Sequence, residues 1–202
     1  ALSMLVDASD EERSVLRAIP YQRNAVTLHS DTSILPQRKK CWAVGGGRYG
    51  AGMKFGAVIT YATEREFTEL ALVAEDAGWD QVFTWEAVWG QDAWVTLGAA
   101  VMATERIRLG TLLTPAARHR PWDLASRVAS VDRLSGGRVT LGVGLGALHG
   151  NWLAFEADEG RAVRARKLDE VLDVYAGLMG GQPFSYTGEY FSASPVTELV
   201  PP

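Results

Sequence analysis

The sequence predicts an α/β fold in which about four strand–helix units follow one another and form a parallel sheet. Three observations lead to this prediction. From residue 53 onward, short apolar runs alternate with longer stretches of helical periodicity, and most of those stretches end at glycines. Hydrophobic residues make up 47% of the chain and charged residues 22%, which is enough apolar material for a core. Strands that alternate with helices pair in parallel through right-handed crossovers.

The first unit has the clearest signals. Residues 55–60 are a short apolar run, which suits a strand buried on both faces. A helix is expected over residues 64–78, because apolar side chains recur there at helical spacing. Thr63 and Glu66 have the spacing of a capping box at its start, and Gly78 stands where a helix typically ends.

The next three units repeat this order with weaker caps. The expected strands are residues 81–84, 107–113 and 139–143. The expected helices are residues 93–103, 124–134 and 163–179, and Gly-Gly pairs follow the last two. Residues 184–191 are expected to form a small hairpin that turns at Gly188. On the apolar face of the third helix, Asp132 is expected to form a structural ion pair with Arg138.

A glycine-rich stretch divides the chain into two parts. Residues 45–52 contain five glycines and are expected to be a flexible linker, followed directly by Met53. Residues 1–44 are expected to be an irregular extension, because so short a segment cannot build a stable core alone. Residues 1–52 carry a net charge of +2 and residues 53–202 a net charge of −6. The main domain is therefore expected at residues 53–202.

Composition excludes several functional classes. The net charge of −4 argues against a nucleic-acid-binding protein, which needs a basic face. No apolar stretch reaches the ~18 residues of a membrane span. The single Cys41 cannot form an internal disulfide, which fits a cytoplasmic location. The three histidines lack metal-ligand spacing, so no metal site is expected.

Glu86 is the best candidate for a catalytic residue. In parallel α/β folds, functional side chains lie beyond the carboxyl ends of the strands, and Glu86 follows the second expected strand. Trp85 and Trp89 flank it, and a carboxylate desolvated among aromatic rings can act as a general acid. The alternative is a structural carboxylate at a helix entrance, shielded by an aromatic cluster.

The same rule selects a set of residues at the strand ends that could bind a cofactor. Residues expected to contact a bound ring or phosphate are Thr60, Thr84, Thr114, Gly144, Leu145 and Gly146. The alternating glycines of residues 142–146 would let a flat ring approach the backbone, although close packing explains them equally well. His119 stands between two arginines before an expected helix start, so it belongs either to an anion site or to a solvated basic loop.

Residues 53–202 resemble the N-terminal half of luciferase-like flavin-dependent monooxygenases. The passages that carry the resemblance are residues 105–111 (ERIRLGT), 120–125, 131–138 (VDRLSGGR), 141–146 (LGVGLG), 164–181, 183–184 and 188–191. The resemblance implies a partial (β/α)₈ TIM barrel that binds FMN or a deazaflavin coenzyme. It also implies flavin-dependent oxidation of a small organic substrate, with O₂ as co-substrate. One departure is Glu86-Ala87, where such enzymes often have Asp-His.

A complete barrel takes ~250 residues, whereas this sequence predicts four strands. An open curved sheet is therefore expected, because barrel closure needs eight strands of this kind. The unpaired edges predict self-association or a need for the missing C-terminal half. The alternative to an enzyme is a truncated, inactive or partner-requiring half-barrel. Residues 1–44 resemble, more loosely, an internal fragment of FAD-dependent amine-oxidase-type proteins, at residues 10–13, 19–24, 28–33 and 35–42.

Overall fold

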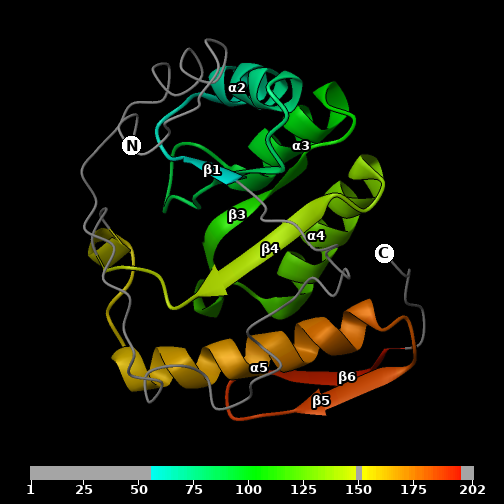
Figure 1. The fold of residues 1–202 in the computed structure, drawn as a ribbon. Helices are drawn as coiled ribbons and strands as arrows, with labels where there is room; N and C mark the ends of the chain where they lie inside the picture. The colour runs from blue at the N-terminus through cyan, green and yellow to red at the C-terminus, as the bar shows by residue number, and fades with distance from the viewer. Residues whose placement is uncertain (1–55, 149–151, 197–202) are drawn as a thin grey trace, which may run out of the picture.

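The computed structural model describes residues 56–148 and 152–196. Their main feature is a four-stranded parallel sheet in the order β1-β2-β3-β4, which remains open (Figure 1). The strands are β1 (Gly56–Ile59), β2 (Gln81–Thr84), β3 (Arg108–Pro115) and β4 (Val139–Gly144). The predicted α/β class and open partial barrel are confirmed. The predicted extension (residues 1–44) and linker (residues 45–52) lie outside the described residues.

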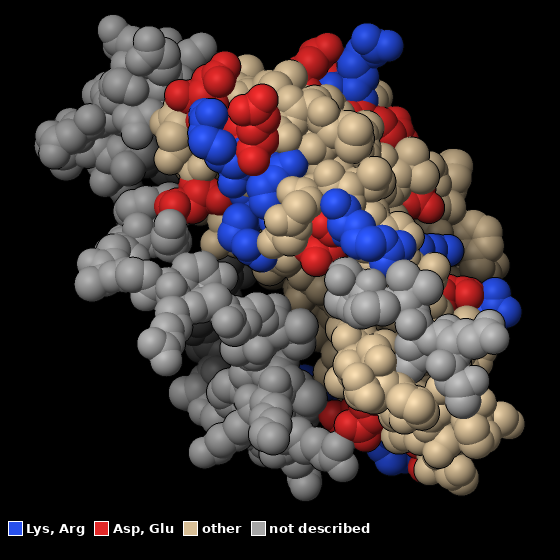
Figure 2. Space-filling view, turned by 90° about the vertical axis from the view of Figure 1, so that its right-hand side faces the viewer, with Lys and Arg blue, Asp and Glu red and all other residues tan. Residues whose placement is uncertain are grey.

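Four helices connect and flank these strands, and each contacts the next along the chain. They are α2 (Glu64–Asp76), α3 (Ala93–Ala103), α4 (Pro121–Ser135) and α5 (Arg161–Met179). Short 3₁₀ turns, η4 (Ala116–Arg118) and η5 (Trp152–Ala154), precede α4 and α5. Among the described helices, none combines the length and apolar character needed to cross a membrane. Charges of both signs are interspersed on the side of the molecule seen in Figure 2.

Helix boundaries follow the predicted caps. In α2, the backbone N–H of Glu66 donates to Oγ1 of Thr63 at 3.3 Å, and the N–H of Thr63 donates to Oε2 of Glu66 at 2.8 Å. This is the capping box that the sequence predicts. Helix α4 ends at Gly136, whose φ of 67° only glycine adopts readily. It begins earlier than predicted, because Pro121 takes the first helical position, where the missing N–H costs nothing.

The C-terminal hairpin is longer than the sequence predicts. Strands β5 (Phe184–Thr187) and β6 (Ser192–Val196) pair antiparallel, so the hairpin extends beyond residue 191. The carboxylate of Glu170 on α5 accepts the backbone N–H groups of Glu189, Tyr190 and Phe191 at 2.7–3.0 Å. A Cβ on Gly188 would collide with that carboxylate, so a larger residue there would force the Glu170 side chain to move. The predicted end of the hairpin, residue 191, was wrong because residues 188–191 form the connection between the strands. Hydrogen bonds to Glu170, on the distant helix α5, stabilise this connection.

The core lies between the sheet and the helices. Its fully buried side chains come from α2, α3, α4, α5 and the two central strands, and include Phe67, Leu97, Leu109, Leu124 and Val171. Burying each such side chain contributes about 1.5–3 kcal/mol. Because the contacts join elements far apart in sequence, the sheet and its helices fold as one unit.

The predicted ion pair between Asp132 and Arg138 is wrong. Oδ1 of Asp132 instead accepts the backbone N–H of Val139 at 3.1 Å. The guanidinium of Arg138 donates five hydrogen bonds to oxygen atoms of residues at the ends of α3 and α4 or just before β3. The acceptors are the carbonyls of Val101, Thr104, Ile107 and Ser135 and Oγ1 of Thr104, at 2.8–3.0 Å. Carbonyls at helix ends have no intrahelical partner, so they bind Arg138 in preference to the carboxylate.

Glu75 is a buried carboxylate on α2 that stabilises the start of β3. It accepts the backbone N–H groups of Glu105, Arg106 and Ile107 at 2.5–3.1 Å. Burial raises the pKa of Glu75, but these backbone donors and the charge of Arg106 together outweigh it, so the pKa lies below its ordinary value. Glu75 is therefore ionised at neutral pH and contributes to stability in that form.

We expect Glu75→Gln to lower the free energy of unfolding at pH 7 by about 2 kcal/mol, because the charged acceptor of three N–H groups is lost. The folded pKa of Glu75 is depressed, so its contribution is complete above the unfolded pKa and is lost as pH falls through the folded pKa. Urea unfolding at pH 7 and pH 3 measures this. The difference from wild type should shrink at pH 3, and exposed Asp76→Asn should change stability by less than about 0.5 kcal/mol. An unchanged difference at pH 3 would contradict the assignment.

Candidate active site

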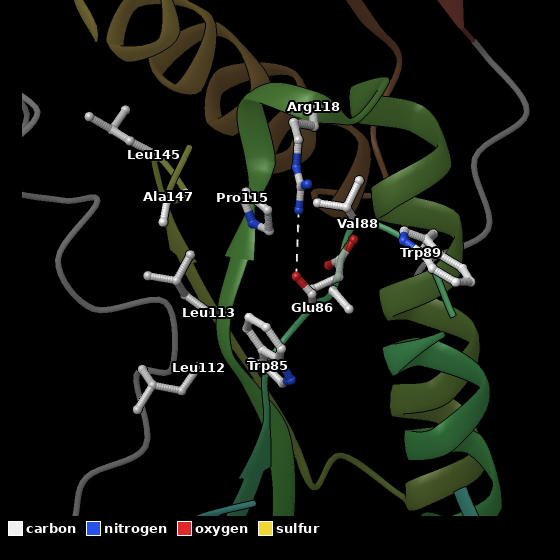
Figure 3. A pocket seen from close by; sticks show the side chains of 12 residues that line it. Trp85, Glu86, Val88, Trp89, Leu112, Leu113, Pro115, Arg118, Leu145 and Ala147 are labelled. Atoms are coloured by element: carbon white, nitrogen blue, oxygen red, sulfur yellow. Dashed lines mark hydrogen bonds between the residues drawn. The ribbon is translucent and has the colours of Figure 1, made fainter. Parts of the chain in front are cut away.

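A cavity of about 650 Å³ lies at the carboxyl ends of the strands. Its walls come from the segment after β2, the end of β3 with η4, and the segment after β4 (Figure 3). The lining residues are Trp85, Glu86, Ala87, Val88, Trp89, Leu112, Leu113, Pro115, Arg118, Leu145, Gly146 and Ala147. Most are apolar, and two carry charge. A largely apolar hollow with a few polar groups is the usual form of a small-molecule site.

Glu86 lies in this cavity because the chain leaves β2 beside the end of β3. Its backbone N–H donates to the carbonyl of Leu113, and its own carbonyl accepts from Nη2 of Arg118 at 3.5 Å, drawn in Figure 3. The Glu86 side chain is only 11% exposed. Its Oε2 atom is buried and has no hydrogen-bond partner. A buried carboxylate with an unsatisfied oxygen is costly, which is typical of a functional group rather than a structural one.

His119 faces Glu86 from the end of η4. Its Nε2 atom lies 2.5 Å from Oε1 of Glu86, and its side chain is 13% exposed. The contact lacks hydrogen-bond angles, so it is an ion pair when the imidazole is protonated. Sequence reasoning noticed His119 but not this contact. The two residues follow the neighbouring strands β2 and β3, so applying the strand-end rule to both would have paired them.

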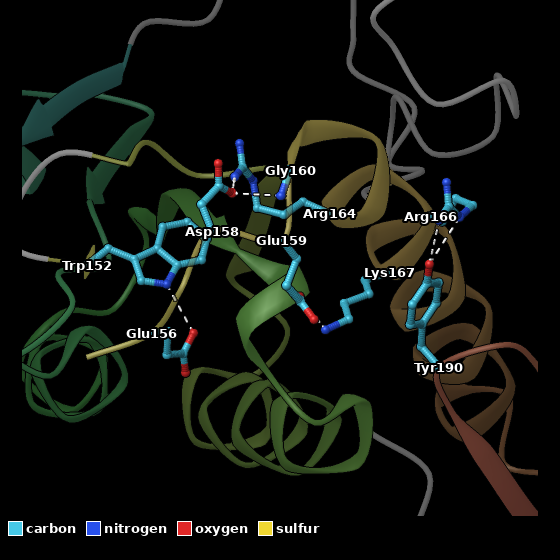
Figure 4. A network of polar contacts seen from close by, with 9 residues as sticks. All are labelled: Trp152, Glu156, Asp158, Glu159, Gly160, Arg164, Arg166, Lys167 and Tyr190. Carbon is cyan, nitrogen blue, oxygen red and sulfur yellow. Dashed lines mark hydrogen bonds and ion pairs between the residues drawn. The ribbon is translucent and has the colours of Figure 1, made fainter. Parts of the chain in front are cut away.

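Arg118 is the cation among the lining residues. Burial lowers its pKa below the ordinary value, and the charges of Glu86 and Glu156 oppose that shift. Its guanidinium lies 4.8 Å from the centroid of the Trp152 ring, and that of Arg164 lies 5.5 Å from it. Such cation–π contacts hold a guanidinium in place. Figure 4 shows how Nε1 of Trp152 in turn donates to Glu156 at 3.0 Å.

An apolar surface formed by β3 and the segment after β4 lines one side of the cavity. The pairing of β3 with β4 shifts register between Thr111 and Thr114, and the intervening Leu112 and Leu113 are exposed. The peptide bond between these leucines is cis. In Figure 3 both leucines lie on the same side as Leu145, opposite Trp89.

The glycines of β4 are explained by close packing within the protein. A Cβ on Gly142 would collide with the carbonyl oxygen of Thr111, and one on Gly144 would lie 2.8 Å from Cδ2 of Leu113. A Cβ on Gly146 would lie 2.6 Å from Cβ of Pro115, and its φ is +71°. Each glycine therefore lets β4 and the segment after it approach β3 closely.

The structure brings together some of the predicted site residues and separates others. Leu145 and Gly146 line the cavity with Glu86. Thr60 lines a neighbouring hollow. Gly144 packs against Leu113. Thr84 and Thr114 are fully buried; their hydroxyls donate to the carbonyl of Trp85 at 3.3 Å and to Oγ1 of Thr111 at 2.9 Å.

Comparisons with known proteins agree with this geometry. The family model described as luciferase-like monooxygenase matches residues 46–202. An F420-dependent glucose-6-phosphate dehydrogenase of Beutenbergia cavernae is 35% identical over 143 residues, which are 66% of this chain and 42% of that protein. This chain spans less than half the length of that relative.

Two solved structures have the same fold. The coenzyme F420-dependent tetrahydromethanopterin reductase of Methanopyrus kandleri superposes with a TM-score of 0.61 at 26% identity, covering 71% of this chain and 45% of that one. The oxygenating constituent of 3,6-diketocamphane monooxygenase of Pseudomonas putida, in complex with FMN, gives 0.62 at 19% identity, covering 72% and 44%. At that identity, the second likeness concerns the fold alone.

Proposed function

Because this chain belongs to the luciferase-like monooxygenase family, we propose that its cavity binds the ring of FMN or of a deazaflavin coenzyme. With FMN, the proposed reaction is oxidation of a small organic substrate with O₂ as co-substrate; with a deazaflavin, the substrate would be oxidised by hydride transfer to the coenzyme. The observation that supports it most directly is the buried Glu86 carboxylate, whose Oε2 atom has no hydrogen-bond partner beside a largely apolar cavity. Such a group is placed to exchange a proton with a bound molecule.

The residues present fit a flavin. A volume of about 650 Å³ lies within the usual range of small-molecule sites. Leu112, Leu113 and Leu145 offer apolar surface to a flat ring, and Trp85 adds an aromatic one. The guanidinium of Arg118 can pair with an anionic group such as a phosphate. When bound, the flavin would supply the electron transfer that no side chain of this cavity can perform.

The chain's own residues would position the substrate and move protons. Glu86 would hold or release a proton at its Oε2 atom, which lacks a hydrogen-bond partner. His119 would act on the reaction through Glu86, because its Nε2 atom lies 2.5 Å from Oε1 of that carboxylate. The apolar surface would exclude water from the reacting atoms, which strengthens every polar contact within the cavity.

A second candidate function is that of a half-barrel that requires a partner. In the described sheet, β1 and β4 each have one unpaired edge, and open edges of this kind favour further pairing. Val58 on β1 and Leu112 and Leu113 on β3 are exposed as well. Self-association, or complementation by a further set of strands, would cover these surfaces. Sedimentation of the chain as a stable monomer at micromolar concentration would exclude self-association.

We expect the chain alone to bind FMN weakly, with a Kd near a millimolar, about −4 kcal/mol, because Arg118 is the sole cation lining the described cavity. If Arg118 pairs with the phosphate, Arg118→Gln should weaken FMN binding about tenfold and change riboflavin binding, which involves no phosphate, less than about threefold. Flavin fluorescence titration gives both affinities. Arg120→Gln is the matched control, since Arg120 is exposed and pairs with Asp123. Equal losses for FMN and riboflavin would contradict the phosphate contact, and failure of both flavins to bind would contradict the proposed function.

A further inference from the structure

A second hollow adjoins the cavity and is rich in exposed aromatic rings. It measures about 630 Å³ and shares Trp85, Ala87 and Trp89 with the main cavity. Its far side is formed by the segment between β1 and α2, which contributes Tyr61, and by the start of α2, which contributes Glu64. The two hollows therefore meet at the segment after β2, in which Glu86 lies between Trp85 and Ala87.

The aromatic rings of this hollow face solvent. Trp89 is 69% exposed and Tyr61 is 59% exposed. The ring centroids of Tyr61 and Trp85 are 5.7 Å apart with an interplanar angle of 60°, an edge-to-face arrangement that fixes both rings. Three aromatic side chains from two separate segments thus line one hollow. Burying these rings in the core would have stabilised the fold more than exposing them does. Exposed rings that gather in this way mark a binding surface.

The charge around the hollow has one sign. Among the described residues, its lining includes the carboxylates Glu64 and Glu66 and no Lys, Arg or His side chain. Glu66 is held by the backbone N–H and hydroxyl of Thr63, and these hydrogen bonds lower its pKa. A ligand with a phosphate or carboxylate would meet two negative charges and no cation. The hollow therefore disfavours anions, in contrast to the main cavity with Arg118.

We propose that this hollow is the substrate subsite, and that it takes a planar aromatic molecule without negative charge, bound against the rings of Tyr61, Trp85 and Trp89. The proposal rests on the proposed function of the main cavity, because the hollow shares Trp85, Ala87 and Trp89 with that cavity and would place the substrate next to a flavin bound there. A substrate of this class is unlike the phosphorylated sugar named for the relative from Beutenbergia cavernae. Substrate choice would then be set by the segments after β1 and β2.

Binding of three probes to the full chain tests the subsite without requiring turnover. The probes are 2-naphthol, which is neutral at pH 7, the anion 2-naphthoate, and decahydro-2-naphthol, which has no aromatic ring. In ligand-observed NMR titrations, 2-naphthol should bind at least tenfold more tightly than either of the others. Equal or tighter binding of 2-naphthoate would overturn the charge argument, and equal binding of the saturated alcohol would overturn the stacking argument.

Variants of Trp89, which lines both hollows, test binding at the aromatic surface. Trp89→Ala should weaken 2-naphthol binding about tenfold, and Trp89→Phe, which keeps a ring, should stay within about threefold of wild type. Tyr61→Ala, at a residue that lines only the second hollow, should weaken 2-naphthol binding to a similar extent and so locates the probe there. Trp122→Ala is the matched control, because Trp122 is also exposed but lies on α4 against Phe191. An unchanged affinity in Trp89→Ala overturns the proposal. Loss of FMN binding with retained, Trp89-dependent naphthol binding would instead contradict the flavin function and leave the aromatic site standing.

Discussion

Replacing Glu86 by glutamine should lower flavin-dependent turnover by about 10²- to 10⁴-fold, the usual contribution of general acid–base catalysis, while flavin affinity changes less than about threefold. Glutamine keeps the shape of the side chain and removes its ability to carry a proton. Because Oε2 of Glu86 is buried and accepts no hydrogen bond, the substitution breaks no hydrogen bond at that atom. Glu86→Gln should therefore not lower the free energy of unfolding by more than about 0.5 kcal/mol.

Steady-state turnover, flavin titration and urea unfolding of the same protein separate these effects. The control is Glu105→Gln, the same change at an exposed carboxylate outside the cavity. It should leave turnover and flavin affinity unchanged. Turnover of Glu86→Gln within threefold of wild type would return Glu86 to a structural role. If stability falls by several kcal/mol along with turnover, the carboxylate serves the fold, and its proposed proton transfer is wrong.

Arg138→Met should lower the free energy of unfolding by about 3 kcal/mol, because carbonyls from α3, α4 and the start of β3 lose their donor together. Methionine has a similar length and no donor. For a chain of this size the melting temperature should fall by roughly 10 °C. Arg138→Lys should give an intermediate loss, since one ammonium cannot reach acceptors on all three sides as the planar guanidinium does.

Urea unfolding followed by tryptophan fluorescence measures the effect of Arg138. Arg133→Ala is the control, because Arg133 is an exposed residue in the last turn of the same helix. It should change the free energy of unfolding by less than about 0.5 kcal/mol. If Arg138→Met unfolds within 1 kcal/mol of wild type, water replaces the guanidinium at these carbonyls and Arg138 does not hold the helix ends together.

Local signals in the sequence predicted the elements of this fold well. The Thr63–Glu66 capping box and the glycine after Ser135 act through neighbouring residues, so their chemistry can be read directly from the sequence. Apolar runs flanked by such signals therefore located every strand of the parallel sheet. The predictions failed where a distant side chain decided the outcome. Glu170 on α5 accepts hydrogen bonds from the connection between the hairpin strands. Arg138 binds carbonyls of α3 rather than its neighbour Asp132.

The candidate site was predictable only in part. The strand-end rule selected Glu86, Leu145 and Gly146, which do line one cavity. It also selected Thr84 and Thr114, whose side chains point into the protein and hydrogen-bond there. Side chains alternate between the faces of a strand, and the shift in register at Leu112 and Leu113 changes that alternation locally. No local pattern reveals such a shift, so the sequence cannot tell which strand-end residues face the cavity.

The glycines along β4 also limit which residues can be replaced when substrate preference is altered by mutagenesis. A Cβ on Gly142 would collide with the backbone carbonyl of Thr111, so a larger residue there would push β4 away from β3, whereas a Cβ on Gly144 would meet only the flexible end of Leu113. Directed evolution that targets Gly142 should yield mostly misfolded variants. Mutagenesis at Tyr61 and Trp89 alters side chains that solvent already surrounds, and the fold should tolerate it. New substrate preferences would arise in these connecting segments, while the β3–β4 surface stays the same in every functional descendant.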